Sequence, residues 1–201
     1  MQINIDNAFE QMKHDFRIMV DEEINQTNQS LLKPQFILIK NKNFIKDDID
    51  KKFSLLFRGS THGFTASQFH NLCDNKGPTV SFILSEFGHV FGDYASDHLR
   101  STDKDYRDYS AFIFSLSKRF IHKQYQNNKE AVGHHKNYMC QFGHSDIIIS
   151  DSCDKKCKSY CNLGGTYELP KEQKFRSYEA QSYLAGQLYF KVLEIEGYSL
   201  I

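Results

Sequence analysis

The stretch from Leu56 to Val80 constrains the fold of this chain most, because it joins a strand, a capped helix and a second strand through short turns. Thr65-Ala66-Ser67-Gln68 has the spacing of a capping box, in which a hydroxyl and an amide side chain satisfy the first free N–H groups of a helix. We expect the helix to stop at Asp74-Asn75-Lys76-Gly77-Pro78, because glycine permits positive φ and proline has no N–H to continue the ladder. A β-branched and aromatic strand is predicted to follow from Thr79 to Leu84.

Strand signals dominate the rest of the chain, and turn residues separate most of them. The predicted strands span 54–58, 79–85, 89–94, 110–117, 138–142, 146–150, 165–169 and 187–200. In the last of these, Glu194 and Glu196 flank Ile195, which predicts one wet and one buried face of an antiparallel sheet. Because few helices stand among the strands, we expect an α+β chain that is mainly an antiparallel β-sandwich of two sheets with a few marginal helices.

A separate amphipathic helix is predicted at the N-terminus. Its apolar residues recur at spacings of four and three, and they are Ile5, Phe9, Met12, Phe16 and Met19. Two interpretations stay open: the helix packs on its own domain, or it docks on a partner, since an isolated helix of this length is marginal in water. The polar residues 25–30 end it. We therefore divide the chain into a helical extension, 1–30, and a domain, 31–201, whose core motifs lie in 53–201.

Composition favours a protein partner. The 25 Lys and Arg residues balance 25 Asp and Glu residues, which removes the electrostatic reason to expect binding to nucleic acid or to an acidic membrane surface. No apolar run approaches the ~20 residues of a transmembrane segment, and the N-terminus carries no secretory signal. The 5 cysteines are an odd number, which favours reduced thiols over a disulfide framework. We expect a cytoplasmic protein.

One segment concentrates the side chains that could bind a metal ion. It holds His134, His135, Cys140, His144, Cys153, Cys157 and Cys161, and thiolate and imidazole are the ligands that zinc selects. The spacing does not match the paired thiols of zinc fingers and ribbons. We therefore expect a polar surface hairpin with incidental cysteines and no cofactor, and keep Cys153, Cys157, Cys161 and His144 as the alternative metal ligands.

No catalytic set can be read from the chain. Phosphate-binding loops, dinucleotide-binding glycine patterns, HExxH and GxSxG are absent from the sequence. Cys73 with His70 three residues before it is the only local pair of a thiol and a base. We expect Cys73 to be a small buried hydrophobic residue at the end of its helix, with a nucleophile as the alternative. We predict that the protein is not an enzyme and has no catalytic residues.

Several blocks of the chain, taken in order, resemble the TLDc domain family. They are Arg58–Val80, Gly88–Ser96, Ser110–Leu116, Asn162–Leu169 and Phe190–Tyr198. The resemblance implies two packed antiparallel sheets with short helices beside them and no defining catalytic triad or cofactor. It also implies, from several members, resistance to oxidative damage and regulation of the vacuolar proton-pumping ATPase. The chain departs from the family pattern at Thr61-His62 and at Gly92-Asp93-Tyr94, and it has no tryptophan.

Three hypotheses about function follow. The leading one is a non-enzymatic interaction module that docks on a large protein assembly, with the proton-pumping ATPase of endomembranes as the family-level candidate. The second is a structural subunit of a cytoskeletal or ciliary assembly, held there by the N-terminal helix. The third is a thiol-based antioxidant protein that uses Cys73, Cys153, Cys157 or Cys161. For the first two, we expect partners to bind the 5–19 helix or the loops 93–108 and 151–162.

Overall fold

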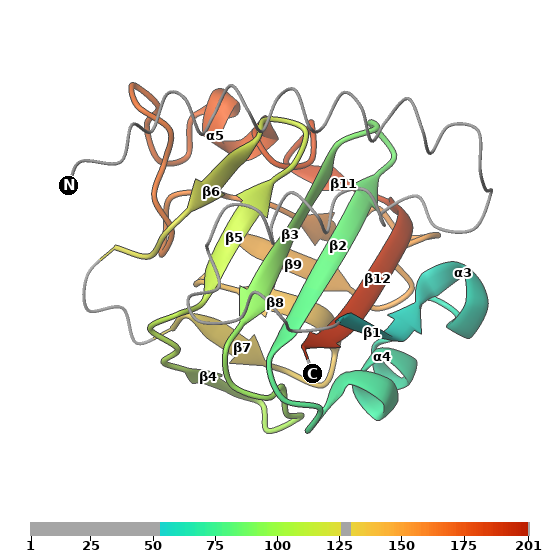
Figure 1. Cartoon of the computed structure of the whole chain (residues 1–201). Helices are drawn as coiled ribbons and strands as arrows, with labels where there is room; N and C mark the ends of the chain where they lie inside the picture. The colour runs from blue at the N-terminus through green and yellow to red at the C-terminus, as the bar shows by residue number, and fades with distance from the viewer. Residues whose placement is uncertain (1–52, 126–129, 201) are drawn as a thin grey trace, which may run out of the picture. The chain divides into compact units, whose positions relative to one another are not determined.

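The computed structural model describes residues 53–125 and 130–200 (Figure 1). They form two six-stranded sheets in which every neighbouring pair of strands is antiparallel. The predicted fold class, mainly antiparallel β with two sheets and few helices, is confirmed. The predicted helix over Ile5–Met19, and with it the extension 1–30, lies outside the described residues.

The two sheets are assembled from strands far apart in the chain. Sheet A consists, in spatial order, of β1 (Phe53–Arg58), β12 (Val192–Leu200), β2 (Thr79–Ser85), β3 (Val90–Ala95), β5 (Phe112–Ser115) and β6 (Phe120–His122). Sheet B consists of β11 (Tyr189–Phe190), β10 (Ser159–Tyr160), β9 (Ile147–Ser150), β8 (Tyr138–Phe142), β7 (Val132–His134) and β4 (Lys104–Tyr106). The last long strand, β12, lies between β1 and β2 and so joins the two ends of the described chain into one sheet.

Among the described residues, three short helices accompany the sheets: α3 (Gly59–His62), α4 (Ala66–Cys73) and α5 (Tyr178–Ser182). The hydroxyl half of the predicted capping box of α4 is confirmed, because Thr65 Oγ1 accepts a hydrogen bond from the N–H of Gln68 at 3.3 Å. None of the helices in 53–125 and 130–200 has the length and apolar character that a membrane span requires.

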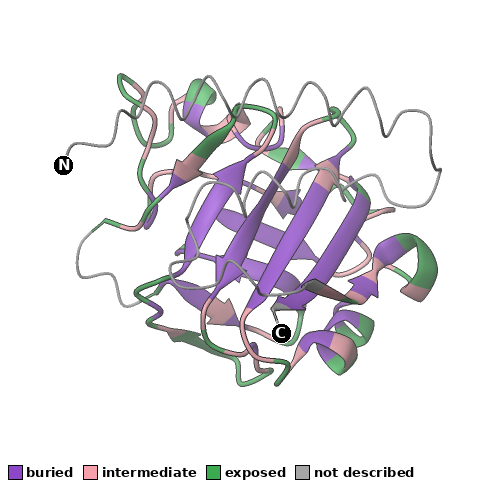
Figure 2. Cartoon of the chain, in the orientation of Figure 1, coloured by how far each residue is buried: buried purple, intermediate pink, exposed green. Residues whose placement is uncertain are grey.

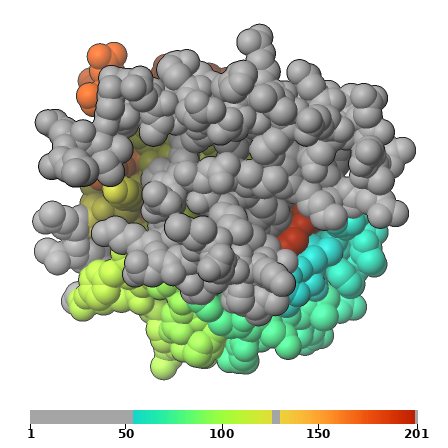
Figure 3. All heavy atoms as spheres, in the orientation of Figure 1, coloured from blue at the N-terminus to red at the C-terminus, as the bar shows by residue number. Residues whose placement is uncertain are grey.

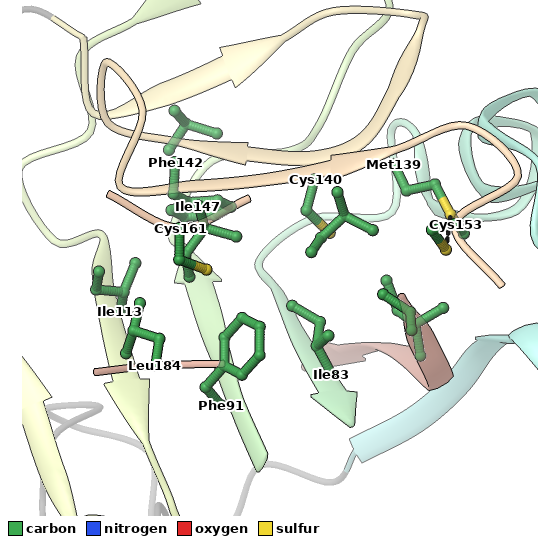
Figure 4. Packing of buried hydrophobic residues seen from close by; sticks show 14 of the residues in the cluster. Ile83, Phe91, Ile113, Met139, Cys140, Phe142, Ile147, Cys153, Cys161 and Leu184 are labelled. Atoms are coloured by element: carbon green, nitrogen blue, oxygen red, sulfur yellow. Dashed lines mark hydrogen bonds between the residues drawn. The ribbon is translucent and has the colours of Figure 1, made fainter. Parts of the chain in front are cut away.

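The hydrophobic core lies between the sheets (Figure 4). Sheet A contributes Phe57, Ile83, Phe91, Ile113 and Ile195, all buried, because alternate residues of a strand point to the same face. Across from them lie buried residues of sheet B and of the loops: Met139, Phe142, Ile147, Ile149, Leu163, Tyr167 and Leu184. Burial of this apolar surface is the main stabilising contribution to the fold.

Two glutamates of β12 correct one expectation. Glu194 and Glu196 were predicted to face water, yet both are buried. The strand that carries them, β12, is mostly purple, the colour of buried residues, in Figure 2. Glu196 accepts two hydrogen bonds: Oε1 from Arg58 Nε and Oε2 from the Tyr198 hydroxyl, each at 2.7 Å. Glu194 Oε1 accepts a hydrogen bond from the N–H of Ser60 at 3.1 Å. Such hydrogen bonds make burial of a carboxylate tolerable, and alternation alone does not reveal them.

Candidate functional site

Three exposed aromatic side chains lie on elements that are joined by hydrogen bonds near the turn at Gly186-Gln187. Phe87, Tyr178 and Tyr189 are 48%, 64% and 55% exposed. We call these three residues the aromatic surface. Aromatic residues are enriched in protein–protein interfaces, and a group of exposed apolar side chains marks an interaction site better than a single one does.

Helix α5 positions Tyr178. The helix begins where Ser177 Oγ accepts a hydrogen bond from the N–H of Ala180 at 3.2 Å, so that Tyr178 is its first residue. Gln187 Nε2 donates to the Tyr178 hydroxyl at 3.3 Å. Ala180 and Leu184 are fully buried and fix this segment to the domain, so the tyrosine is presented by an anchored element.

The turn between β2 and β3 positions Phe87. Ser85 Oγ donates to the carbonyl of Ala185 at 2.8 Å, which joins this turn to the segment that follows α5. Gly186 has φ of +95°, and a side chain there would meet Cβ of Phe87 at 2.9 Å. The close approach of Phe87 therefore depends on glycine at this position.

Strand β11 positions Tyr189 at the edge of sheet B. It pairs with β10, where the Tyr160 ring lies 5.8 Å from the Tyr189 ring, centroid to centroid. The turn is fixed to this strand region as well, because the N–H of Glu86 donates to the Lys191 carbonyl and the N–H of Lys191 donates to Glu86 Oε1 at 2.8 Å. In Figure 1, α5, β11 and the turn between β2 and β3 all lie at the same end of the domain.

The aromatic surface combines apolar rings with two hydroxyl groups and is held by hydrogen bonds between three elements. A preformed surface of this kind loses little conformational entropy when it binds. Aromatic rings that carry a polar group are typical of protein interfaces. Sequence reasoning did not find it, because its residues come from three separate segments and share no local pattern.

The proposed metal ligands do not come together. Cys153 and Cys161 are buried in the core, where they lie apart (Figure 4). Cys157 is exposed, and the His144 side chain, 77% exposed, pairs with Glu130. Within the described parts of the chain, no three His, Cys, Asp or Glu side chains are grouped as a metal site requires. The loop that carries the cysteines is fixed to the domain by backbone bonds such as Ser152 N–H to Phe64 O, 2.8 Å.

The pair of Cys73 and His70 is not built for thiolate chemistry. Burial raises the pKa of the Cys73 thiol to about 12, and the nearby Asp74 charge acts in the same direction. Both ring nitrogens of His70 face other groups: Asp74 on one side, backbone carbonyls on the other. Burial also raises the pKa of Cys153 to about 12 and those of Cys140 and Cys161 well above the usual range. Reactive thiolates need the opposite shift.

The described structure also contains buried carboxylates that sequence reasoning missed. Asp146 accepts hydrogen bonds from the N–H groups of Gly164, Gly165, Thr166 and Tyr167, at 2.8 to 3.3 Å. Asp108 binds the N–H groups of Ser96, Asp97, Ser110 and Ala111. The Asn162–Leu169 block is thus an anion-binding loop that this chain fills with its own Asp146. Its role is structural.

Comparison with known proteins identifies relatives. The family model described as the TLDc domain matches residues 24–201. Interferon-induced protein 44 of Homo sapiens is 45% identical over 47 residues, which cover 23% of this chain and 10% of that protein. The protein of the same name from Pan troglodytes matches to the same extent. The matched part is about a tenth of the length of these curated relatives.

Proposed function

Because the chain belongs to the TLDc domain family, we propose that it is a non-enzymatic interaction module that docks on a large protein assembly. The vacuolar proton-pumping ATPase, in connection with resistance to oxidative stress, is the assembly that the family resemblance favours. The aromatic surface is the single observation that carries the proposal. Exposed and fixed in place, Phe87, Tyr178 and Tyr189 have the character of anchor residues in protein interfaces.

A binding assay with matched variants tests this proposal. The probe is the purified peripheral sector of the proton-pumping ATPase, immobilised and titrated with the purified chain. We expect the double variant Tyr178→Ala and Tyr189→Ala to bind at least about tenfold more weakly, because truncation of a central aromatic anchor costs roughly 2 kcal/mol.

The control is Tyr109→Ala, since Tyr109 is 78% exposed but lies in the loop between β4 and β5, in a different part of the fold. It should bind like the wild-type chain. Equal weakening by the control and the double variant would remove the aromatic surface from the proposal, and no binding by the wild-type chain would remove the ATPase.

A further inference from the structure

His70 lies at a junction of three segments of the described domain. It is in the last turn of α4, is only 9% exposed, and its ring meets the Phe69 ring edge-on at 5.7 Å. Next to it lie the loop before β4 and the turn between β7 and β8. In Figure 3 the yellow-green atoms of the segment around residue 100 lie beside the green atoms of the segment around residue 75.

Both ring nitrogens of His70 face hydrogen-bond acceptors. Nδ1 lies 2.8 Å from Asp74 Oδ1, and Nε2 lies 2.8 Å from the carbonyl oxygen of Tyr138 and 3.2 Å from that of His135. A neutral imidazole carries one N–H and would leave a lone pair against one of these acceptors. Only the doubly protonated imidazolium donates on both sides.

Asp74 is an ionised carboxylate in this arrangement. Its second oxygen, Oδ2, accepts from the Ser101 hydroxyl at 2.8 Å. Burial alone would raise its pKa, but the hydrogen bonds from His70 and Ser101 outweigh burial and hold the pKa below its usual value. For His70 likewise, burial would lower the pKa, but Asp74 and the two carbonyls outweigh it and raise the pKa above 6.5.

The other titratable group that faces His70 is His134 of β7. Burial, followed by the charge of Arg100, lowers the pKa of His134 to about 4, with Asp74 and Asp97 acting in the opposite direction. His134 is therefore neutral at neutral pH and does not compete with His70 for the proton. Asp74 is the one anion bonded to the His70 ring among the residues that the structure describes.

Backbone hydrogen bonds connect the three segments around this cluster. The N–H of Asn75 donates to Leu99 O at 3.0 Å, and the N–H groups of Thr102 and Asp103 donate to His134 O at 3.0 and 2.9 Å. The turn is connected to the loop by the N–H of Lys136, which donates to Asp103 Oδ1 at 3.2 Å. A change in the hydrogen bonds of His70 is therefore expected to alter the stability of the loop 99–103 and the turn 135–138.

We propose that His70 is a pH-sensitive latch that holds the end of α4, the loop 99–103 and the turn 135–138 together when protonated and loosens them when it loses its proton. Because the pKa of His70 is raised on folding, its stabilisation is complete below pH 6.5 and is lost as the pH rises through the folded pKa. The latch needs no partner and so stands independently of the function proposed above.

Nitrogen NMR of the histidine rings in the full chain tests the latch directly. At pH 6.5, His70 should carry protons on both ring nitrogens and should titrate above this pH, and Asp74→Asn should lower that titration point. His144, which is exposed, is the reference histidine in the same spectrum. A His70 ring with a single N–H at pH 6.5 would overturn the proposal.

Amide hydrogen exchange measures the consequence. After correction for the intrinsic rate, exchange in 99–103 and 135–138 should increase by up to about tenfold per pH unit above pH 6.5, the limit for release of one proton. In His70→Gln the dependence should vanish, and in His144→Gln it should remain. Persistence in His70→Gln would contradict the latch, and if that variant does not fold, the wild-type ring titration alone decides.

Discussion

At the residue scale, buried carboxylates organise the loops of this domain. Asp146 satisfies four backbone N–H groups of the Gly164–Tyr167 loop, and Asp108 does the same for the loop that enters β5. Buried N–H groups must find acceptors, and where no strand supplies them a carboxylate can. This explains how the long loops here stay attached to the sandwich.

Replacing Asp146 should therefore destabilise the fold strongly. Asp146→Ala leaves several buried N–H groups without an acceptor, and each such group costs about 1–3 kcal/mol. We expect a loss of at least roughly 3 kcal/mol, measured by urea denaturation. Asp154→Asn, at a more accessible position in the 151–158 turn, is the control and should change stability by no more than about 0.5 kcal/mol. Equal stability of the two variants would show that the loop does not depend on Asp146.

Asp93 gives the protein a second pH dependence. It is buried on β3, and burial raises its pKa to about 7, while hydrogen bonds with Ser81 and Cys140 act in the opposite direction. An acid with a raised folded pKa binds more protons in the native state, so the free energy of unfolding falls as the pH rises from 3.8 to about 7 and then levels off.

We expect Asp93 to contribute up to about 1.4 kcal/mol per pH unit to this decline. Asp93→Asn should remove this contribution in urea denaturation series over this pH range, whereas Asp154→Asn, at an accessible position of the 151–158 turn, should keep it. A decline of the same slope in Asp93→Asn would assign the effect to another group. The effect of Asp93 on the free energy of unfolding ends near pH 7, whereas the effect of His70 lies above pH 6.5. Amide exchange in the segments next to His70 reports the His70 effect alone and so distinguishes the two.

At the scale of elements, local signals predicted the segments that carry their own caps and periodicity. The capping box at Thr65 and the β-branched run after Pro78 led to α4 and β2 with nearly correct bounds. Strands of two or three residues, such as β7 and β10, have no periodicity to detect; they exist because each pairs with a neighbouring strand on both sides. The predicted strand 165–169 is largely the loop that binds Asp146, with one bridge from Tyr167 to Gln124.

The cap of α4 should make a measurable contribution. Thr65→Ala removes the side-chain acceptor for the N–H of Gln68, and loss of an N-cap costs about 1 kcal/mol. Thermal unfolding should show a lower midpoint for Thr65→Ala. Ser67→Ala, at an exposed position in the first turn of the same helix, should differ little from the wild type. A midpoint unchanged in Thr65→Ala would mean that packing of Phe69 and Cys73 alone holds the helix.

At the scale of the whole molecule, topology decides which residues meet. The aromatic surface combines a turn after β2 with α5 and β11, more than ninety residues later in the chain. Single residues such as Phe87 carry no sign of such a partnership, so the sequence predicted the sandwich but not this surface. The thiols Cys153, Cys157 and Cys161 show the opposite case: they are close together in the sequence, but the fold buries two of them and exposes the third.

Thiol accessibility checks this arrangement of the molecule. Of the 5 cysteines, Cys157 is exposed and the other four are buried. An aromatic disulfide reagent should therefore react with one thiol per native chain and with all of them after denaturation. Cys157→Ser should abolish the native reaction. Rapid reaction of a second thiol would revive the thiol-based alternative.

Direct binding of the wild-type chain to the proton-pumping ATPase tests the central claim. Sedimentation of the purified chain with the purified peripheral sector measures both the bound fraction and the stoichiometry, and the rate of ATP hydrolysis can be followed in the same samples. We predict a saturable complex of defined stoichiometry with a changed hydrolysis rate. A chain that sediments alone at every concentration and leaves the rate unchanged would contradict the account.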